Sequence, residues 1–215
     1  MSEAIFSFES LSCERGGRVL FEGVSQSLRA GECLYVAGPN GAGKTSLLRI
    51  LAGLLAPAEG TVRWRGRDIR EAREEYGAEL AFVGHHNGSK DDLTIAENLA
   101  FAAAARGEPH DRDQAVAALG RLGLAGREDV PVRRLSQGQK RRAALARLCM
   151  GEAPVWILDE PFNALDRDSV AVLGGLIEAQ LARGGVVLLT AHQAVDLPAG
   201  ARRLEIGAPA AGAAP

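Results

Sequence analysis

The feature of this 215-residue chain that most constrains its fold is a glycine-rich loop at residues 38–46, GPNGAGKTS. The loop fits the pattern G-x-x-x-x-G-K-[ST], which forms between a strand and the N-terminus of a helix. The apolar run CLYVAG before it suits a buried strand, and KTSLLRILAGLL after it has a helical periodicity that stops near Pro57. The loop therefore predicts a strand–loop–helix unit.

The same loop predicts a site for the phosphates of a nucleoside triphosphate. Glycines let backbone N–H groups wrap around a phosphate chain, and the helix N-terminus adds partial positive charge. Lys44 supplies a cation toward the β- and γ-phosphates, and the Thr45 hydroxyl can ligate Mg²⁺. A glycine-rich turn with an unrelated lysine is the simpler alternative, but it does not explain the complete motif in this context. The predicted nucleotide-binding residues of the loop are Gly38, Pro39, Asn40, Gly41, Ala42, Gly43, Lys44, Thr45 and Ser46.

An acidic pair, Asp159 and Glu160, follows the apolar run VWIL. This strand can lie beside the strand of the phosphate loop, and Pro161 ends it because proline offers no N–H to a ladder. Asp159 is then expected to hold Mg²⁺ directly or through water, and Glu160 to polarise the attacking water. Two solvated carboxylates at the end of a strand are the alternative interpretation.

Strands that alternate with helices along the chain predict an α/β fold. Early strands are expected at 5–8 and 19–28, separated by the turn RGGR, with an edge hairpin in GTVRWRGRDI, and they predict an antiparallel portion. Residues 94–122 are alanine-rich, are broken at RGEPH and predict a separate helical lobe. Ser136 and Gln139 can form a capping box at the start of another helix. The remaining predictions are strands in AELAFVG, PVWILD, GVVLLT and ARRLEIG, a helix at 167–182 and a disordered tail at 208–215.

Composition excludes several classes of protein. The hydrophobic fraction of 47% and the charged fraction of 24% are ordinary for a soluble globular protein, and a net charge of −2 gives no sign of a nucleic-acid partner. No apolar run approaches the ~20 residues of a membrane-spanning helix, and the N-terminus does not read as a signal peptide. Three scattered cysteines fit a reducing compartment without a disulfide framework or zinc spacing, so the cytoplasm is expected.

Five segments, GPNGAGKT, LSQGQ, WILDEP, NALD and TAH, occur in the order and spacing of ATP-binding-cassette (ABC) ATPases, which the chain resembles from residue 3 to about 207. The resemblance implies a P-loop NTPase fold with a mostly parallel core sheet, an antiparallel β-subdomain and a helical lobe at about 93–150. Residues 1–215 would then form a single ABC nucleotide-binding domain. Its ligands would be ATP and Mg²⁺, and its catalytic residues Lys44, Glu160 and His192.

In that family the signature segment LSQGQ faces the phosphate loop of a second subunit, so that two ATP molecules are sandwiched between head-to-tail copies. One phosphate loop and one signature segment in this chain therefore imply a homodimer. A helix N-terminus with a serine and a glycine is also physically suited to an anion. The residues implied to act on the partner's ATP are Ser136, Gln137, Gly138, Gln139 and Asp166.

Several positions raise alternatives. His85 stands where the family carries glutamine, and it can ligate Mg²⁺ or lie in a solvated loop. Asn163 stands where serine is usual. Arg15 replaces an aromatic residue and can stack on adenine or point to solvent. By resemblance His192 would reach the γ-phosphate. A lone histidine after a strand is more often structural, but its position one strand after the acidic pair favours the γ-phosphate.

The segments CERGGRVLF, FVGHHNGSKDDLT, LSQGQKRRAALARL and WILDEPFNALD resemble the ATPases of bacterial haem exporters used in cytochrome c maturation. This resemblance implies a subunit that binds integral-membrane partners on the cytoplasmic face of the inner membrane. The helical lobe is expected to dock on them, although its run LAFAAAA can equally be an internal helix face. A nutrient importer subunit, a soluble ABC ATPase without a transport role and a scaffold that only binds ATP are the competing hypotheses.

Overall fold

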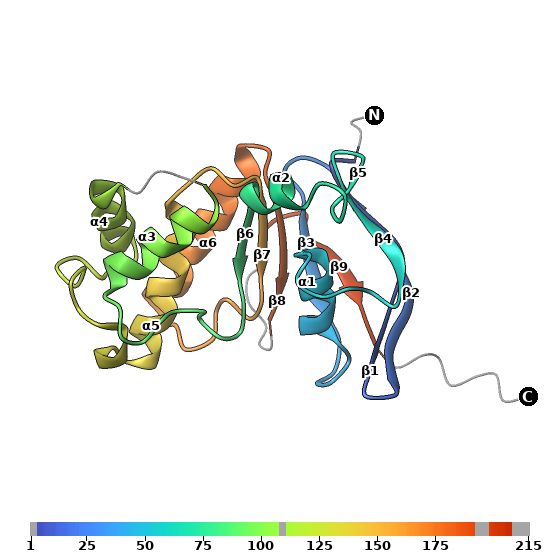
Figure 1. Cartoon of the computed structure of the whole chain (residues 1–215), viewed down its shortest axis with the longest axis horizontal. Helices are drawn as coiled ribbons and strands as arrows, with labels where there is room; N and C mark the ends of the chain where they lie inside the picture. The colour runs from blue at the N-terminus through green and yellow to red at the C-terminus, as the bar shows by residue number, and fades with distance from the viewer. Residues whose placement is uncertain (1–3, 108–110, 192–197, 208–215) are drawn as a thin grey trace, which may run out of the picture.

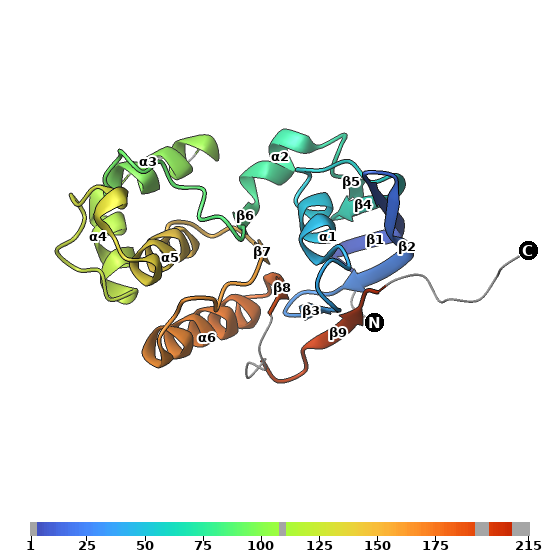
Figure 2. The same cartoon turned by 90° about the horizontal axis from the view of Figure 1, so that it is seen from below.

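The computed structural model describes residues 4–107, 111–191 and 198–207. Within these ranges the chain forms two β-sheets and a group of helices (Figure 1). Helices α3 to α6 gather on one side of a parallel sheet, and an antiparallel sheet lies on the other side, with α1 between the two sheets (Figures 1 and 2). The predicted fold class is confirmed by this arrangement.

The antiparallel sheet has the order β2-β1-β4-β5. Strands β1 (Phe6–Arg15) and β2 (Arg18–Leu28) form a hairpin, and β4 (Glu59–Trp64) and β5 (Arg67–Asp68) complete the sheet with β5 at its edge. Strand β1 runs further than the predicted 5–8. Its polar–apolar alternation breaks at Ser10, which has a φ of 50° and lies at a shift in the strand register. Sequence alternation stops at such a bulge although the strand continues.

The parallel sheet has the order β6-β7-β8-β3-β9 and every neighbouring pair in it is parallel. Strands β7 and β8 are buried along their whole length, which is why they read as continuous apolar runs. One prediction is wrong here: the strand before the acidic pair does not lie beside β3, because β8 separates them. The bounds are β3 (Cys33–Ala37), β6 (Leu80–Val83), β7 (Val155–Leu158), β8 (Val186–Thr190) and β9 (Arg202–Glu205).

The buried side chains of this sheet divide between two cores. Val155 and Ile157 of β7 face the core that contains α1 and the antiparallel sheet, whereas Trp156 and Leu158 face the core that contains the other helices. Helix α1 (Lys44–Leu51) ends earlier than predicted, before Gly53 with its φ of 69°. Both faces of the parallel sheet are therefore covered, as parallel sheets require.

Helix α2 (Arg73–Ala78) was not predicted, since its six residues carry one strongly apolar side chain, Tyr76. That side chain is buried, and its hydroxyl donates to the Leu51 carbonyl at the end of α1, with an O–O distance of 2.7 Å. The helix is thus fixed by a tertiary contact that no local periodicity reveals.

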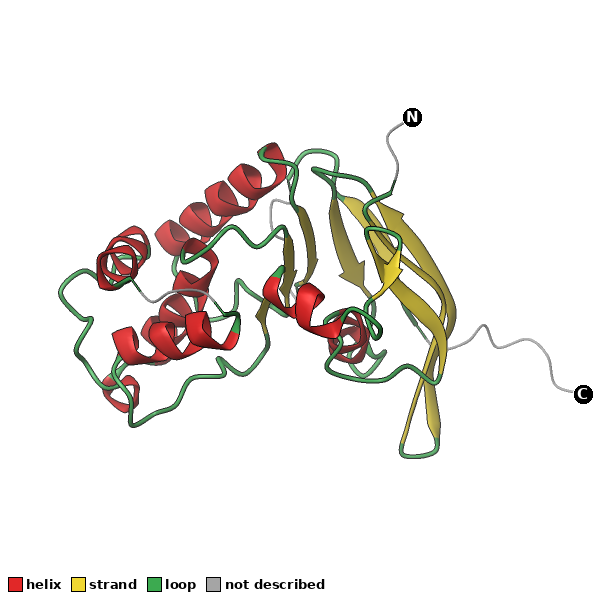
Figure 3. Ribbon diagram, turned by 45° about the horizontal axis from the view of Figure 1, so that its top comes forward, coloured by secondary structure: helices red, strands yellow, loops and turns green. Residues whose placement is uncertain are grey.

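The predicted helical lobe is seen as α3 (Ile95–Ala105), α4 (Arg112–Arg121) and α5 (Gln137–Leu145), which share one apolar core with α6 (Arg167–Ala182) (Figure 3). Two short 3-10 helices, Val132–Arg134 and Ala146–Cys149, flank α5. Helix α3 ends at Ala105, directly before the predicted break RGEPH, of which residues 108–110 lie outside the described residues. The predicted tail at 208–215 lies outside the described residues. Within the part of the chain that is described, no helix combines the length and apolarity that a bilayer crossing requires.

Candidate nucleotide site

The phosphate loop joins β3 to α1, and two of its glycines are required by the backbone. Gly38 has a φ of 146°, and a Cβ there would lie 2.0 Å from the Ile206 carbonyl oxygen. Gly43 has a φ of 98°, and a Cβ there would lie 3.0 Å from side-chain atoms of Leu20 and Phe21. As the N-cap of α1, Gly43 offers no side-chain acceptor to the first N–H groups of the helix. Those groups point at the place where a phosphate would bind.

Lys44 is 8% exposed although it carries a charge. Its Nζ donates to the carbonyl oxygens of Gly38 at 2.8 Å and Pro39 at 3.1 Å. The ammonium group therefore lies inside the loop. The loop therefore curls back over the end of the Lys44 side chain.

A pocket of about 460 Å³ opens beside this loop and joins it to the acidic pair. It brings together four residues that the sequence singled out, Thr45, His85, Asp159 and Glu160. They come from α1, from the segment after β6 and from the end of β7. Arg49, Phe82, Gly84 and His86 also line the pocket.

Asp159 at the end of β7 is 1% exposed. Its Oδ1 accepts a hydrogen bond from the Thr190 hydroxyl at 2.7 Å, whereas its buried Oδ2 has no hydrogen-bond partner among the described residues. A buried carboxylate oxygen without a partner is costly unless a cation or donor satisfies it. Together with the Thr45 hydroxyl it forms an oxygen donor set of the kind that Mg²⁺ prefers.

The protein side chains alone would not complete such a metal site. The described residues contain no group of three or more His, Cys, Asp or Glu side chains placed to hold an ion. Magnesium is commonly bound through one or two protein ligands together with the phosphates of a substrate. The donor set of Thr45 and Asp159 fits that pattern and not a permanent metal centre.

Glu160 has a backbone conformation that is uncommon for a residue with a side chain, with a φ of 51°. Two contacts hold it there: its N–H donates to the Thr190 hydroxyl at 2.9 Å, and its carbonyl accepts from Nη2 of Arg141 at 2.7 Å. Its Oε2 lies 2.6 Å from Nδ2 of Asn163 and 3.1 Å from Nδ1 of His85. The carboxylate thus faces the pocket in a fixed orientation.

Arg141 in α5 is a residue of the site that the sequence reasoning missed. Its guanidinium is buried and donates to the carbonyls of Gly84, Asp159 and Glu160 at 2.7–2.8 Å. Longer bonds of 3.3 Å reach the Pro161 carbonyl and Oδ1 of Asn87. Burial lowers the pKa of Arg141, and the charges of Asp159 and Glu160 oppose that shift. In the sequence, Arg141 stands between two other basic residues, Lys140 and Arg142, and nothing distinguishes it from them.

The signature residues lie at the N-terminus of α5 and do not line this pocket. The predicted capping box is confirmed: Oγ of Ser136 accepts from the Gln139 N–H at 3.3 Å, and Oε1 of Gln139 accepts from the Ser136 N–H at 3.0 Å. Asp166 caps α6 by accepting from the Ser169 N–H at 2.9 Å, and the hydrogen bonds from Ser169 lower the pKa of its carboxyl. Gln137 is exposed, and Gly138 is close to the Ala164 carbonyl, 2.9 Å from where a Cβ would lie.

Three other predicted site residues, Arg15, Asn40 and Gly41, are exposed. Arg15 is exposed at the end of β1, two residues after Cys13. Burial raises the pKa of the Cys13 thiol, and the Arg15 charge and a hydrogen bond with Ser46 oppose that shift, so β1 and the start of α1 are in contact. Asn40 and Gly41 are exposed at the tip of the loop. His192 lies outside the described residues.

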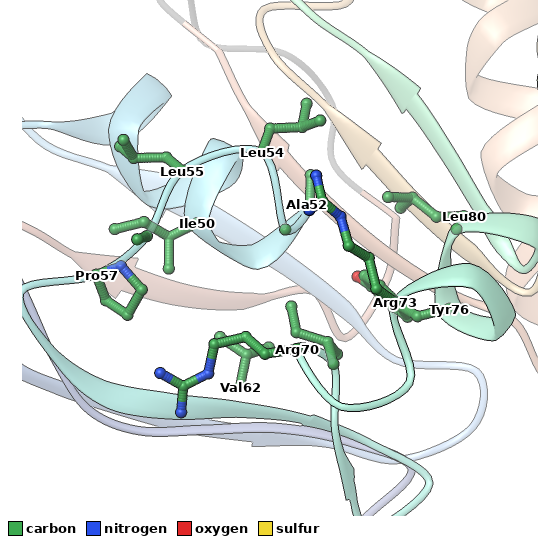
Figure 4. A pocket seen from close by; sticks show the side chains of 14 residues that line it. Ile50, Ala52, Leu54, Leu55, Pro57, Val62, Arg70, Arg73, Tyr76 and Leu80 are labelled. Atoms are coloured by element: carbon green, nitrogen blue, oxygen red, sulfur yellow. The ribbon is translucent and has the colours of Figure 1, made fainter.

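A second pocket, of about 540 Å³, lies at the opposite end of α1 and shares no residue with the first. Leu54 and Leu55 lie on one side of it and Val62 and Arg70 on the other (Figure 4). Its lining is mainly apolar, and Leu54 is 57% exposed. This pocket lacks the acidic pair and the phosphate loop, so it is not a candidate for the nucleotide.

Comparison with known proteins identifies the family. The family profile described as ABC transporter matches residues 21–163, two thirds of the chain. The chain belongs to the ABC transporter family. It is an ABC ATPase, as the order of its motifs predicted.

Among curated relatives, the cytochrome c biogenesis ATP-binding export protein CcmA of Methylococcus capsulatus is 50% identical over 206 residues, covering 96% of this ABC ATPase and 100% of the relative. The CcmA protein of Paramagnetospirillum magneticum is 46% identical over 209 residues, covering 96% and 95%. Among solved structures, the ATP-binding subunit of an ABC transporter aligns with a TM-score of 0.80 at 26% identity, covering 87% of this chain and 79% of that one. The ADP conformation of an ATP-binding cassette, at 23% identity, a TM-score of 0.77 and coverage of 96% and 88%, supports the fold alone.

Proposed function

We propose that this ABC ATPase is the ATP-hydrolysing subunit of an export complex that handles haem for cytochrome c biogenesis. The observation that carries the catalytic part is the single pocket in which Thr45, Asp159 and Glu160 meet beside the phosphate loop. The cargo is supported by the name of the CcmA relatives, which align over nearly their full length.

ATP binding starts from the loop. The N–H groups at the start of α1 and the ammonium of Lys44 would bind the β- and γ-phosphates, with Lys44 exchanging its bonds to the Gly38 and Pro39 carbonyls for bonds to phosphate oxygens. Mg²⁺ held by the Thr45 hydroxyl and Asp159 would offset the phosphate charge. The exposed guanidinium of Arg15 is proposed to stack on the adenine ring.

Hydrolysis requires one proton acceptor beside the γ-phosphate. The oxygen of a water molecule attacks the γ-phosphorus, the bond from that phosphorus to the β–γ bridging oxygen breaks, and ADP and phosphate leave. Glu160 accepts the proton of the attacking water. His192 is proposed to contact the γ-phosphate. Positioning and charge stabilisation supply most of the acceleration in such reactions.

The signature residues are proposed to act on ATP bound to a second copy. Ser136, Gln137, Gly138 and Gln139 lie at a helix N-terminus outside the pocket, and Asp166 lies at the start of α6. A head-to-tail homodimer would bring each signature segment to the partner's phosphate loop. ATP would then hold the two copies together, and hydrolysis would separate them.

The complex also requires integral-membrane subunits, and we propose that this chain binds them at the cytoplasmic face of the inner membrane. The helical lobe carries Phe101, a large apolar side chain with 54% exposure, on α3. The run LAFAAAA contributes to both faces of that helix, because Leu99 and Ala103 are buried while Phe101 is exposed. An exposed aromatic residue on this lobe supports its role as the docking surface.

The test is Glu160→Gln in the full chain. The substitution removes the proton acceptor while keeping the shape, so we expect ATP to bind with unchanged affinity, turnover to fall by at least about 100-fold and ATP to trap a dimer. Analytical ultracentrifugation with and without ATP measures the dimer. Glu178→Gln, at an exposed position of α6, is the matched control and should behave as the wild type. A Glu160→Gln protein that stays monomeric in saturating ATP would contradict the sandwich.

Deleting the gene tests the cargo separately. Loss of c-type cytochromes with other haem proteins intact is expected, because the export step serves only haem attachment to cytochrome c. Normal c-type cytochromes together with a nutrient uptake defect would instead favour an importer.

A further inference from the structure

Two residues that depart from the family pattern, His85 and Asn163, meet on one atom. His85 follows β6, and Asn163 follows β7 by five residues. Nδ1 of His85 lies 3.1 Å and Nδ2 of Asn163 lies 2.6 Å from the same oxygen, Oε2 of Glu160. The two unusual residues are therefore related, since each places a nitrogen beside the carboxylate of Glu160, the proposed proton acceptor.

The chemistry of the three groups fixes the direction of both contacts. A carboxylate only accepts hydrogen bonds, and the amide nitrogen of asparagine only donates them. For His85 to bond to the same oxygen, its Nδ1 must carry the hydrogen. A nitrogen that donates to Glu160 cannot ligate a cation at the same time. This geometry favours a contact with Glu160 over the Mg²⁺ role that the sequence suggested for that nitrogen.

Hydrogen bonds hold the backbone of Glu160 as well as its side chain. The φ of 51° is maintained by the Thr190 hydroxyl on the N–H and by Arg141 on the carbonyl. The Glu160 side chain is 11% exposed, whereas that of His85 is 55% exposed. The buried carboxylate therefore accepts one hydrogen bond from the more exposed His85 and one from Asn163 in the loop that follows β7.

We propose that His85 and Asn163 are paired positioning residues that hold the Glu160 carboxylate in the orientation needed to accept the proton of water. The proposal rests on the role given to Glu160 above. Serine at 163 would reach one bond less far than asparagine, so the shared contact on Oε2 needs the longer side chain. The two departures act together, because both side chains donate to the same oxygen of one carboxylate and so set its last torsion jointly.

The kinetic test compares single and double substitutions under saturating ATP. We expect His85→Ala and Asn163→Ala each to lower kcat about 10-fold, since small misplacements of a reacting group cost rate, while KM for ATP stays within about twofold. The double variant should lose about as much as either single variant, well short of the ~100-fold product expected for independent sites. His85→Gln keeps an N–H donor and should recover at least about threefold in kcat over His85→Ala.

Asn163→Asp sharpens the test because it changes one atom. It removes the donor and places a second carboxylate against Oε2, so kcat should fall further than in Asn163→Ala. Unchanged kcat in both alanine variants, a rise in kcat, or a double variant that shows the full product would each overturn the pairing.

Glu160→Gln separates this proposal from the proposed function. If Glu160→Gln hydrolyses ATP at the wild-type rate, the proton-acceptor role is wrong and the pairing loses its basis. If Glu160→Gln is inactive while His85→Ala and Asn163→Ala are fully active, the function stands and only the pairing is wrong.

A readout without turnover uses ¹⁵N-labelled histidine in the nucleotide-free protein at about pH 8.5, where ordinary imidazoles are neutral. The His85 resonance, assigned with His85→Gln, should report the hydrogen on Nδ1. Glu160→Ala should shift that resonance toward the Nε2–H form. A wild-type His85 with its hydrogen on Nε2, or no response to Glu160→Ala, would contradict the contact.

Discussion

The N-termini of α1 and α5 are both proposed to bind phosphate, but they are built in opposite ways. The N-cap of helix α1 is Gly43, whose φ of 98° excludes most side chains and which supplies no side-chain cap. The N-cap of helix α5 is Ser136, which forms a complete capping box with Gln139. The first turn of α1 therefore offers its N–H groups to a ligand, whereas α5 already satisfies two of its own donors.

This difference indicates what one copy can do alone. At α1 the Lys44 ammonium must exchange its bonds to the Gly38 and Pro39 carbonyls, but no capping side chain competes for the first N–H groups of the helix. At α5 a phosphate must compete with the Ser136 and Gln139 side chains for the same backbone groups. A single chain should therefore bind ATP at the phosphate loop, and engage the signature helix only when a partner brings its γ-phosphate close.

Lys44→Ala tests phosphate binding at the N-terminus of α1, and we expect the largest effect from this substitution. Bonds from a charged donor are each worth roughly 1.5–3 kcal/mol, so losing the ammonium should weaken ATP binding by at least about 100-fold. Isothermal titration of the single chain measures it. Lys140→Ala, which removes the lysine of the signature helix, should leave that affinity unchanged. Equal losses of ATP affinity in the two variants would mean that the N-termini of α1 and α5 do not differ in how they bind ATP.

Arg141→Ala should remove the hydrogen bonds that join the signature helix α5 to the acidic pair beside the phosphate loop. The guanidinium joins α5 to the carbonyls of Gly84, Asp159 and Glu160, and removing it leaves buried acceptors unsatisfied. We expect a loss of about 3 kcal/mol of stability, or roughly 6–12 °C in Tm. Thermal unfolding measures it, with exposed Arg134→Ala as a control expected within ±0.5 kcal/mol. A wild-type Tm for Arg141→Ala would show that these hydrogen bonds do not contribute to the stability of the fold.

Arg141→Lys refines the same prediction. Lysine keeps the charge but cannot fork across several carbonyls, so its Tm should fall between those of the wild type and the alanine variant. Full recovery by lysine would mean that charge, and not geometry, is what the Asp159–Pro161 turn needs.

The sequence predicted most of this molecule where local chemistry decides the structure. The phosphate loop, the Ser136 cap and the buried strands β7 and β8 could be read because glycine, serine and continuous apolar runs each have a local physical consequence. Helix α2 could not be read, since Tyr76 is fixed by a bond to Leu51 that is distant in sequence. The position of β8 between β7 and β3 depends on sheet order, which strand composition does not encode.

The site shows the same division. Thr45, Asp159 and Glu160 were found from their motifs, and the structure brings them to one pocket. Arg141 was missed because its acceptors are backbone carbonyls, which carry no sequence signal. His85 and Asn163 were noticed as departures, but their common contact on Glu160 depends on how the loops after β6 and β7 fold.

Ser136→Ala removes the N-cap of α5. We expect it to have the smallest effect on stability and a selective effect on the ATP-induced dimer. Removing an N-cap costs about 1 kcal/mol, or roughly 2–4 °C in Tm, and should leave ATP binding by the single chain unchanged. The matched control is Thr94→Ala, since Thr94 and Glu97 form the same capping box at α3. Both substitutions should lower Tm equally, but in a Glu160→Gln background only Ser136→Ala should weaken the ATP-induced dimer. If the two variants dimerise alike, Ser136 serves its own helix and no phosphate of a partner.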